Sequence, residues 1–258
     1  NFGSVAPMPE EFVDEMAQLG ASQLELRAEW LVRSALGHIR ILEELDFHET
    51  KVSLKAFEVP VLLEAYRRFA ALPNDYPLHL GVTEAGTPRA GSVRSAVGIG
   101  TLLALGIGDT IRVSLTTDPV EEVFVAYEIL KSLELRQKGA TMIACPTCGR
   151  VEVDLFTLAN QVDEFLAKVD EPIRVAVMGC VVNGPGESRD ADVGLAAGNG
   201  KGVIFRKGRI VRTVAEADML TALKEEIAAV LEDRRNGIIE EGTSPGDRYR
   251  PMLTLTPV

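Results

Sequence analysis

Hydrophobic positions follow two alternating spacings along the first part of the chain. Apolar residues at helical spacing predict helices over residues 22–45, 59–72, 92–106 and 120–135. Short runs rich in β-branched residues predict strands over 51–55, 77–83, 109–116 and 141–145. Strand–helix units that repeat about every 30 residues are typical of parallel strands joined by helical crossovers. The pattern therefore predicts an α/β fold.

The number of these units limits the possible architectures. About four strand–helix units precede Cys145, whereas a closed (β/α)8 barrel needs about eight. Residues 1–4 resemble the end of one more strand. Two architectures stay open on the pattern alone: an open parallel sheet, or the second half of a TIM-type barrel.

The pattern changes after Cys148. Helices are expected over 155–169 and 216–234, with a buried strand over 173–179 and a glycine-rich region with two β-type runs over 192–214. These elements predict a small α+β domain. We therefore expect three parts: the barrel part at 1–145, the small domain at 146–235, and a tail at 236–258, where no periodicity is visible.

Polar side chains gather at the predicted carboxyl ends of the strands, which form the catalytic edge of a barrel or an open parallel sheet. Lys55, Glu84, Ser114 and Cys145 occupy such positions. Cations and a hydroxyl on neighbouring strands, here Lys51, Lys55, Arg112 and Ser114, suit a phosphate or diphosphate. Glu84 could act as a general acid. Taken alone, Glu84 fits a helix cap or an ion pair at least as well, and for each of the other residues taken alone a structural role is favoured over a functional one.

Composition narrows the classes of partner. The chain has 46% hydrophobic and 25% charged residues with a net charge of −11, which is ordinary for a globular protein and argues against nucleic acid or an anionic membrane as the main partner. No apolar run approaches the ~20 residues that a membrane span needs. An anionic substrate remains possible, because a site can be locally basic in an acidic protein.

Three cysteines carry the most specific signal. Two lie in Cys145-Pro-Thr-Cys148 and the third in the Gly-Cys180-Val-Val-Asn-Gly-Pro-Gly-Glu187 segment. Thiolates suit zinc or an iron–sulfur cluster, and an odd number of cysteines in a reducing, cytoplasmic setting argues against disulfides. Zinc would need a fourth Cys or His nearby.

The three histidines, His38, His48 and His79, all lie in the earlier half of the chain, which favours the cluster over zinc. Glu187 is the natural candidate for a fourth, exchangeable ligand. A solvated surface carboxylate is the alternative reading of this residue.

Five segments in this order, PLHLGVTEAG, SAVGIGTLL, GDTIRVSL, ACPTCGR and GCVVNGPGE, resemble the 4-hydroxy-3-methylbut-2-enyl diphosphate synthases of the bacterial two-domain type. These are iron–sulfur reductases of the non-mevalonate isoprenoid pathway. The resemblance extends over about residues 1–235. It implies a TIM-type barrel followed by a small α+β domain that binds a [4Fe–4S] cluster.

The resemblance also implies roles for individual residues. Cys145, Cys148, Cys180 and Glu187 would hold the cluster, and substrate would displace Glu187. Glu84 would be the catalytic acid. The substrate-binding residues would be Lys55, Arg112, Ser114 and Asn183. The implied reaction is the reductive ring opening and dehydration of 2-C-methyl-D-erythritol 2,4-cyclodiphosphate.

Reduced flavodoxin or ferredoxin would supply two electrons, and a homodimer would bring one subunit's cluster domain over the other's barrel. The family has about half a barrel before the position of Asn1, so we expect this chain to be part of a longer protein. Two other functions remain open from the residues: a non-catalytic iron–sulfur electron-transfer module, and an aconitase-like lyase that uses a cluster iron as Lewis acid.

Overall fold

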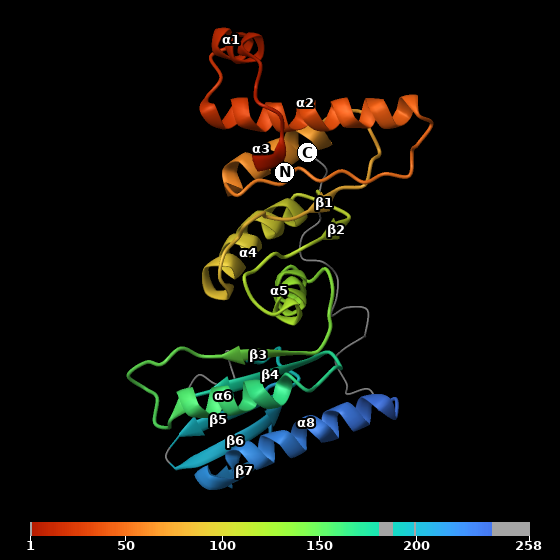
Figure 1. Cartoon of the computed structure of the whole chain (residues 1–258). Helices are drawn as coiled ribbons and strands as arrows, with labels where there is room; N and C mark the ends of the chain where they lie inside the picture. Colours follow the sequence, from red (N-terminus) through yellow and green to blue (C-terminus); the bar gives the residue numbers. More distant parts are fainter. Residues whose placement is uncertain (1, 181–187, 199, 239–258) are drawn as a thin grey trace. The chain divides into compact units, whose positions relative to one another are not determined.

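A computed structural model describes residues 2–180, 188–198 and 200–238 of the chain. The chain divides into two compact units, one that extends to Arg136 and one that begins at Gln137. Figure 1 shows the order of the elements in both units.

The first unit consists of helices and short parallel strand segments. It contains a 3-10 turn η1 (Phe2–Ser4) and helices α1 (Glu10–Gln18), α2 (Gln23–Glu44), α3 (Val59–Ala70), α4 (Pro88–Ala104) and α5 (Pro119–Ser132). Strands β1 (His79–Leu80) and β2 (Thr110–Ile111) pair in parallel, and Val52 forms a parallel bridge with Leu78. The extended segments at 52–56, 78–83 and 110–114 thus lie side by side, as the predicted α/β pattern requires.

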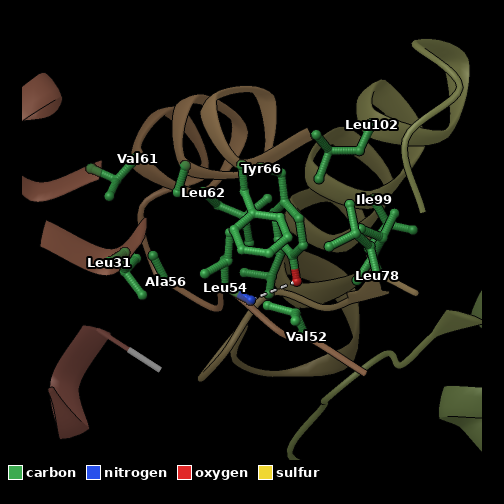
Figure 2. Packing of buried hydrophobic residues seen from close by; sticks show 14 of the residues in the cluster. Leu31, Val52, Leu54, Ala56, Val61, Leu62, Tyr66, Leu78, Ile99 and Leu102 are labelled. Atoms are coloured by element: carbon green, nitrogen blue, oxygen red, sulfur yellow. Dashed lines mark hydrogen bonds between the residues drawn. The ribbon is translucent and has the colours of Figure 1, made fainter. Parts of the chain in front are cut away.

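One hydrophobic core holds the first unit together. Val52, Leu54, Leu78 and Leu80 point from the strand segments toward apolar side chains of α2, α3 and α4. Figure 2 shows Tyr66 of α3 at the centre of this core. Its ring is fully buried, and its hydroxyl accepts a hydrogen bond from the backbone N–H of Leu54 at 3.0 Å. This core fixes which face of the strands remains available for a site.

The second unit is a five-stranded mixed sheet covered by two helices. Strands β3 (Ala140–Ala144), β4 (Ile173–Met178) and β5 (Val193–Gly198) are parallel neighbours, and β6 (Lys201–Arg206) and β7 (Arg209–Ala215) continue the sheet in antiparallel fashion. Helices α6 (Leu155–Leu166) and α8 (Met219–Arg235) pack on one face of the sheet, and the 3-10 turn η2 (Glu216–Asp218) leads into α8. The expected α+β domain is present.

Most predicted helices lie where the pattern places them, but helix α1 was not predicted, and residues 2–4 form the 3-10 turn η1 instead of a strand end. The strands are shorter than predicted: that at 51–55 forms only a bridge at Val52, and that at 77–83 is regular only over β1. The predicted strand at 109–116 is regular only over β2, since the residues after Ile111 continue as extended chain. The sequence pattern assigns the strand at 141–145 to the barrel part. The structure instead pairs β3 with β4, so the division falls after Arg136 and not after residue 145.

In the part of the chain that the structure describes, no helix has both the length and the apolar character needed to cross a membrane.

Candidate functional site

The polar face of the first unit is built from three parallel extended segments. Backbone hydrogen bonds connect them: the N–H of His79 donates to the carbonyl of Val52 at 2.8 Å, and the N–H of Arg112 donates to that of Leu80 at 2.9 Å. Side chains alternate between the two faces of a strand. Because Val52, Leu54, Leu80 and Val113 face the core, their neighbours along the chain face the other way.

This other face carries cations. Lys51, Lys55 and Arg112 lie on it, with Ser53, His79 and Ser114 between or beside them. Lys55 is half-buried, and its pKa is lowered first by burial and then by the positive charges of Arg112 and Lys51. Among the described residues, no carboxylate forms an ion pair with Lys51, Lys55 or Arg112. A concentration of unpaired positive charge in a protein with a net charge of −11 is suited to an anion.

His79 adds a titratable group to the same face. Its Nδ1 is 2.8 Å from the hydroxyl oxygen of Thr110. Its pKa is lowered first by burial and then by Lys55, Lys51 and Arg112. A neutral His79 is therefore the form that these cations favour while no anion lies among them.

Glu84 lies just beyond the end of the middle segment, with an unusual backbone. Its φ is +57°, in the left-handed region that costs a non-glycine residue about 1–2 kcal/mol. Of the other non-glycine residues described with positive φ, Asp46 and Glu134 follow helix ends and Lys207 lies in the β6–β7 hairpin. Glu84 lies in the turn that follows the middle segment. Its exposed side chain makes no hydrogen bond or ion pair with another described residue, so the carboxyl group remains available.

The turn that contains Glu84 is tied to both neighbouring segments. The N–H of Thr83 donates to the carbonyl of Ala56 at 3.3 Å, and the N–H of Thr116 donates to that of Gly86 at 2.9 Å. Glu84 therefore lies at the same carboxyl edge as the segment ends that carry Lys55 and Ser114. The prediction that these residues occupy one edge agrees with the strand pairing.

In the second unit, two cysteines come from neighbouring strand ends. Cys145 directly follows β3, and its N–H donates to the carbonyl of Val177 in β4 at 3.3 Å. Cys180 comes two residues after the end of β4. The N–H of Gly179 donates to the Sγ of Cys145 at 3.2 Å, which brings the two cysteine segments together. None of the three cysteines forms a disulfide.

The structure shows only part of the expected ligand set. Cys148 lies exposed in the turn after Cys145, where its carbonyl accepts from the N–H of Val151 at 3.1 Å. Asn183 and Glu187 fall outside the described residues. Within the described ranges, no three His, Cys, Asp or Glu side chains are gathered closely enough to hold a metal ion.

Comparison with protein-family models decides the family. The model described as the GcpE TIM-barrel domain matches residues 1–127, and the model of the GcpE protein C-terminal domain matches residues 141–229. The chain belongs to the GcpE family. The barrel description also decides between the two architectures that the strand count left open, in favour of the TIM-type barrel.

Curated relatives agree with the GcpE assignment. A protein of Dehalococcoides mccartyi (strain CBDB1) is 61% identical over 203 residues, which cover 79% of this chain and 58% of the relative. A protein of Geobacillus thermodenitrificans is 57% identical over 206 residues (80% and 55%), and one of Bacillus subtilis is 56% identical over 206 residues (80% and 54%). All three are named 4-hydroxy-3-methylbut-2-en-1-yl diphosphate synthase (flavodoxin). The chain thus spans a little over half the length of these relatives.

Two residues on the cationic face were not predicted from the sequence, His79 and Gly81. His79 carried no functional signal of its own. His79 lies two residues before Gly81 and four residues before Thr83, so the alternation of side chains along a strand places all three on one face. This alternation could have identified His79 from the sequence. Gly81, between Lys55 and Arg112, offers no side-chain chemistry, so only the strand pairing reveals its place.

Proposed function

We propose that this chain belongs to an oxidoreductase that converts 2-C-methyl-D-erythritol 2,4-cyclodiphosphate to 4-hydroxy-3-methylbut-2-enyl diphosphate by reductive ring opening and dehydration. The observation that carries the proposal is the cationic face of Lys51, Lys55 and Arg112, which has no carboxylate partner among the described residues. The GcpE family membership and the shared name of the relatives support it.

In this proposal the first unit holds the diphosphate. Arg112 offers a planar fork of N–H donors, which matches two phosphate oxygens, while the Lys55 ammonium acts as a compact charge. Ser114 donates its hydroxyl to a phosphate oxygen, and Asn183 is a further proposed substrate-binding residue. Glu84 donates its proton to the oxygen that leaves the carbon skeleton, because its carboxyl group lies at the same edge of the strands.

Cys145, Cys148, Cys180 and Glu187 are the proposed ligands of a [4Fe–4S] cluster. Three thiolates and one carboxylate suit a [4Fe–4S] cluster, because thiolates are the usual ligands of such clusters and a carboxylate is a ligand that substrate can replace. The hydrogen bond that the Gly179 N–H donates to the Cys145 sulfur is of the kind that stabilises a metal-bound thiolate. When bound, the cluster supplies electrons and a Lewis-acidic iron.

Substitution of Cys180 tests the cluster assignment. We expect Cys180→Ser to lose the iron, the acid-labile sulfide and the visible absorption that the unaltered protein gains on anaerobic reconstitution, since a serine hydroxyl replaces a soft thiolate. Ala144→Ser is the matched control, because it adds a hydroxyl at the exposed end of β3 and removes no thiolate. Equal iron and absorbance in Cys180→Ser and the control would contradict the assignment.

Two further assays separate this function from the alternatives. Turnover that requires a reductant, such as reduced flavodoxin or ferredoxin, distinguishes a reductase from an aconitase-like lyase. An electron-transfer module would accept electrons but bind no cyclic diphosphate. The word flavodoxin in the names of the relatives favours flavodoxin as the donor.

We also propose that the protein works as a homodimer in the cytoplasm, where its thiols stay reduced. Sedimentation of the reconstituted protein should give twice the mass of one chain. A monomer that is fully active would contradict the dimer.

A further inference from the structure

Gly81 occupies the position between Lys55 and Arg112 on the cationic face. It is not among the glycines with positive φ, so any residue could adopt its backbone conformation. The constraint on a larger residue at position 81 is the space available for its Cβ. A Cβ built on Gly81 would lie 2.9 Å from the carbonyl oxygen of Arg112, 3.2 Å from Cε of Lys55 and 3.5 Å from its Nζ.

These distances show where the Lys55 side chain lies. Its terminal carbon and its ammonium lie across the middle strand segment, directly over Gly81, and extend toward the segment that carries Arg112. The lowered pKa of Lys55, caused first by burial and then by Arg112 and Lys51, agrees with this path. A lysine that extended into solvent would be neither half-buried nor close to a second cation.

We infer that Gly81 is a positioning residue for the diphosphate site, because the absence of a Cβ lets the Lys55 ammonium lie across the middle strand beside Arg112. The two cations then face one diphosphate group together. The inference rests on the proposed function for the identity of the anion. Gly81 itself touches no phosphate in this arrangement. It acts through Lys55 and through the backbone at Arg112, whose carbonyl oxygen a Cβ would meet at 2.9 Å.

Binding of inorganic pyrophosphate, measured by titration calorimetry, tests the inference in a double-mutant cycle. Gly81→Ala should weaken binding about tenfold, since it displaces a charged donor from the anion. Lys55→Met should weaken binding at least as much. The double variant should lose less than the product of the two single losses, because the part of the Gly81 effect that runs through the ammonium is absent once Lys55 is replaced, while the contact with the Arg112 carbonyl remains.

Gly100→Ala is the matched control. It makes the same substitution in the same unit, and its Cβ would lie 4.0 Å from the nearest atom, in Ile129. It should bind pyrophosphate like the unaltered chain. If the losses of Gly81→Ala and Lys55→Met multiply in the double variant, or if Gly81→Ala binds normally, Gly81 does not act through Lys55.

A measurement on the unaltered chain covers the case in which Gly81→Ala fails to fold. The protons on Cε of Lys55 should show a nuclear Overhauser effect to the α-protons of Gly81, and its absence would overturn the inference. If the effect is present but the unaltered chain binds no pyrophosphate, the proposed function fails at its substrate site. If the unaltered chain binds pyrophosphate but the losses of the two single variants multiply in the double variant, only the role of Gly81 is contradicted, and the proposed function stands.

Discussion

At the scale of single residues, the buried hydroxyl of Tyr66 connects the core to the strand that carries the cations. It accepts from the N–H of Leu54 at 3.0 Å and donates to the carbonyl of His79 at 2.5 Å. Burial raises the pKa of Tyr66, so the phenol stays neutral. Both backbone partners belong to segments of the polar face, and Tyr66 thus fixes their spacing.

We expect Tyr66→Phe to lower the free energy of unfolding by about 1–3 kcal/mol, because it leaves the buried N–H of Leu54 without its partner. Urea unfolding followed by fluorescence of Trp30, the single tryptophan, measures this loss. Tyr76→Phe is the control, because the Tyr76 hydroxyl donates a hydrogen bond to Glu43 at the surface. This substitution should change the free energy of unfolding by at most ~0.5 kcal/mol. Equal losses in the two variants would contradict the role given to the buried hydroxyl.

The sequence pointed to candidate site residues by their side-chain types, but not to the residues that support them. Lys55, Arg112 and Ser114 stood out because charged and hydroxyl side chains interrupt apolar strands, and the strand pairing does place them on one face. Gly81 and Tyr66 did not stand out. A glycine and a core tyrosine acquire their roles only from atoms of segments that are distant in sequence.

At the scale of elements, helix α4 packs so closely on its surroundings that more than one of its three glycines has no room for a Cβ, and Gly98 is one of them. A Cβ on Gly98 would lie 2.7 Å from Cγ2 of Val82, whereas a Cβ on Gly100 would make only an ordinary contact, at 4.0 Å, with Cγ2 of Ile129. Both residues lie inside the same helix, where alanine is intrinsically favoured over glycine by about 1 kcal/mol.

Of the three glycines of α4, Gly98 and Gly100 should therefore respond with opposite signs to substitution by alanine. We expect Gly100→Ala to raise the free energy of unfolding by about 0.5–1 kcal/mol. Gly98→Ala should lower it by about 1–3 kcal/mol, because the short, stiff side chain of Val82 cannot move away without overpacking the core. Thermal and urea unfolding measure both changes. Stabilisation by both substitutions would show that α4 can shift outward at little cost.

Helices were predicted more accurately than strands. The apolar spacing over 22–45 and 59–72 is a local property, and α2 and α3 fall within those limits. The capping box formed by Ser22 and Glu25 also fixes the start of α2 locally. Strand β3 was assigned to the wrong sheet, because a strand's own sequence does not specify the partner with which it pairs.

At the scale of the whole molecule, each unit has its own hydrophobic core. Leu62 of α3 is fully buried in the core of the first unit, and Leu223 of α8 is fully buried in that of the second. Trp30 reports on the first unit: its Nε1 donates to the carbonyl of Ala6 at 2.8 Å, and its ring centroid is 5.0 Å from that of Phe12.

We expect the two units to unfold in separate transitions. Leu62→Ala should lower the stability of the first unit by about 2–5 kcal/mol and shift the Trp30 fluorescence transition. Leu223→Ala should leave the Trp30 fluorescence transition unchanged. It should shift only the part of the far-ultraviolet circular dichroism transition that comes from unfolding of the second unit. Each variant is the control for the other. A shift of Trp30 fluorescence by Leu223→Ala would show that the units unfold together.

The sequence by itself determined the α/β class, most of the helices apart from α1, and the residue types that carry cations and thiolates. These features depend on periodicity within one element or on the chemistry of one side chain. Only the tertiary structure decided that β3 joins the second sheet, that Glu84 has a left-handed backbone, and that Lys55 lies across Gly81. Strand pairing and the space between strands depend on contacts between residues far apart in the chain, and no local pattern records them.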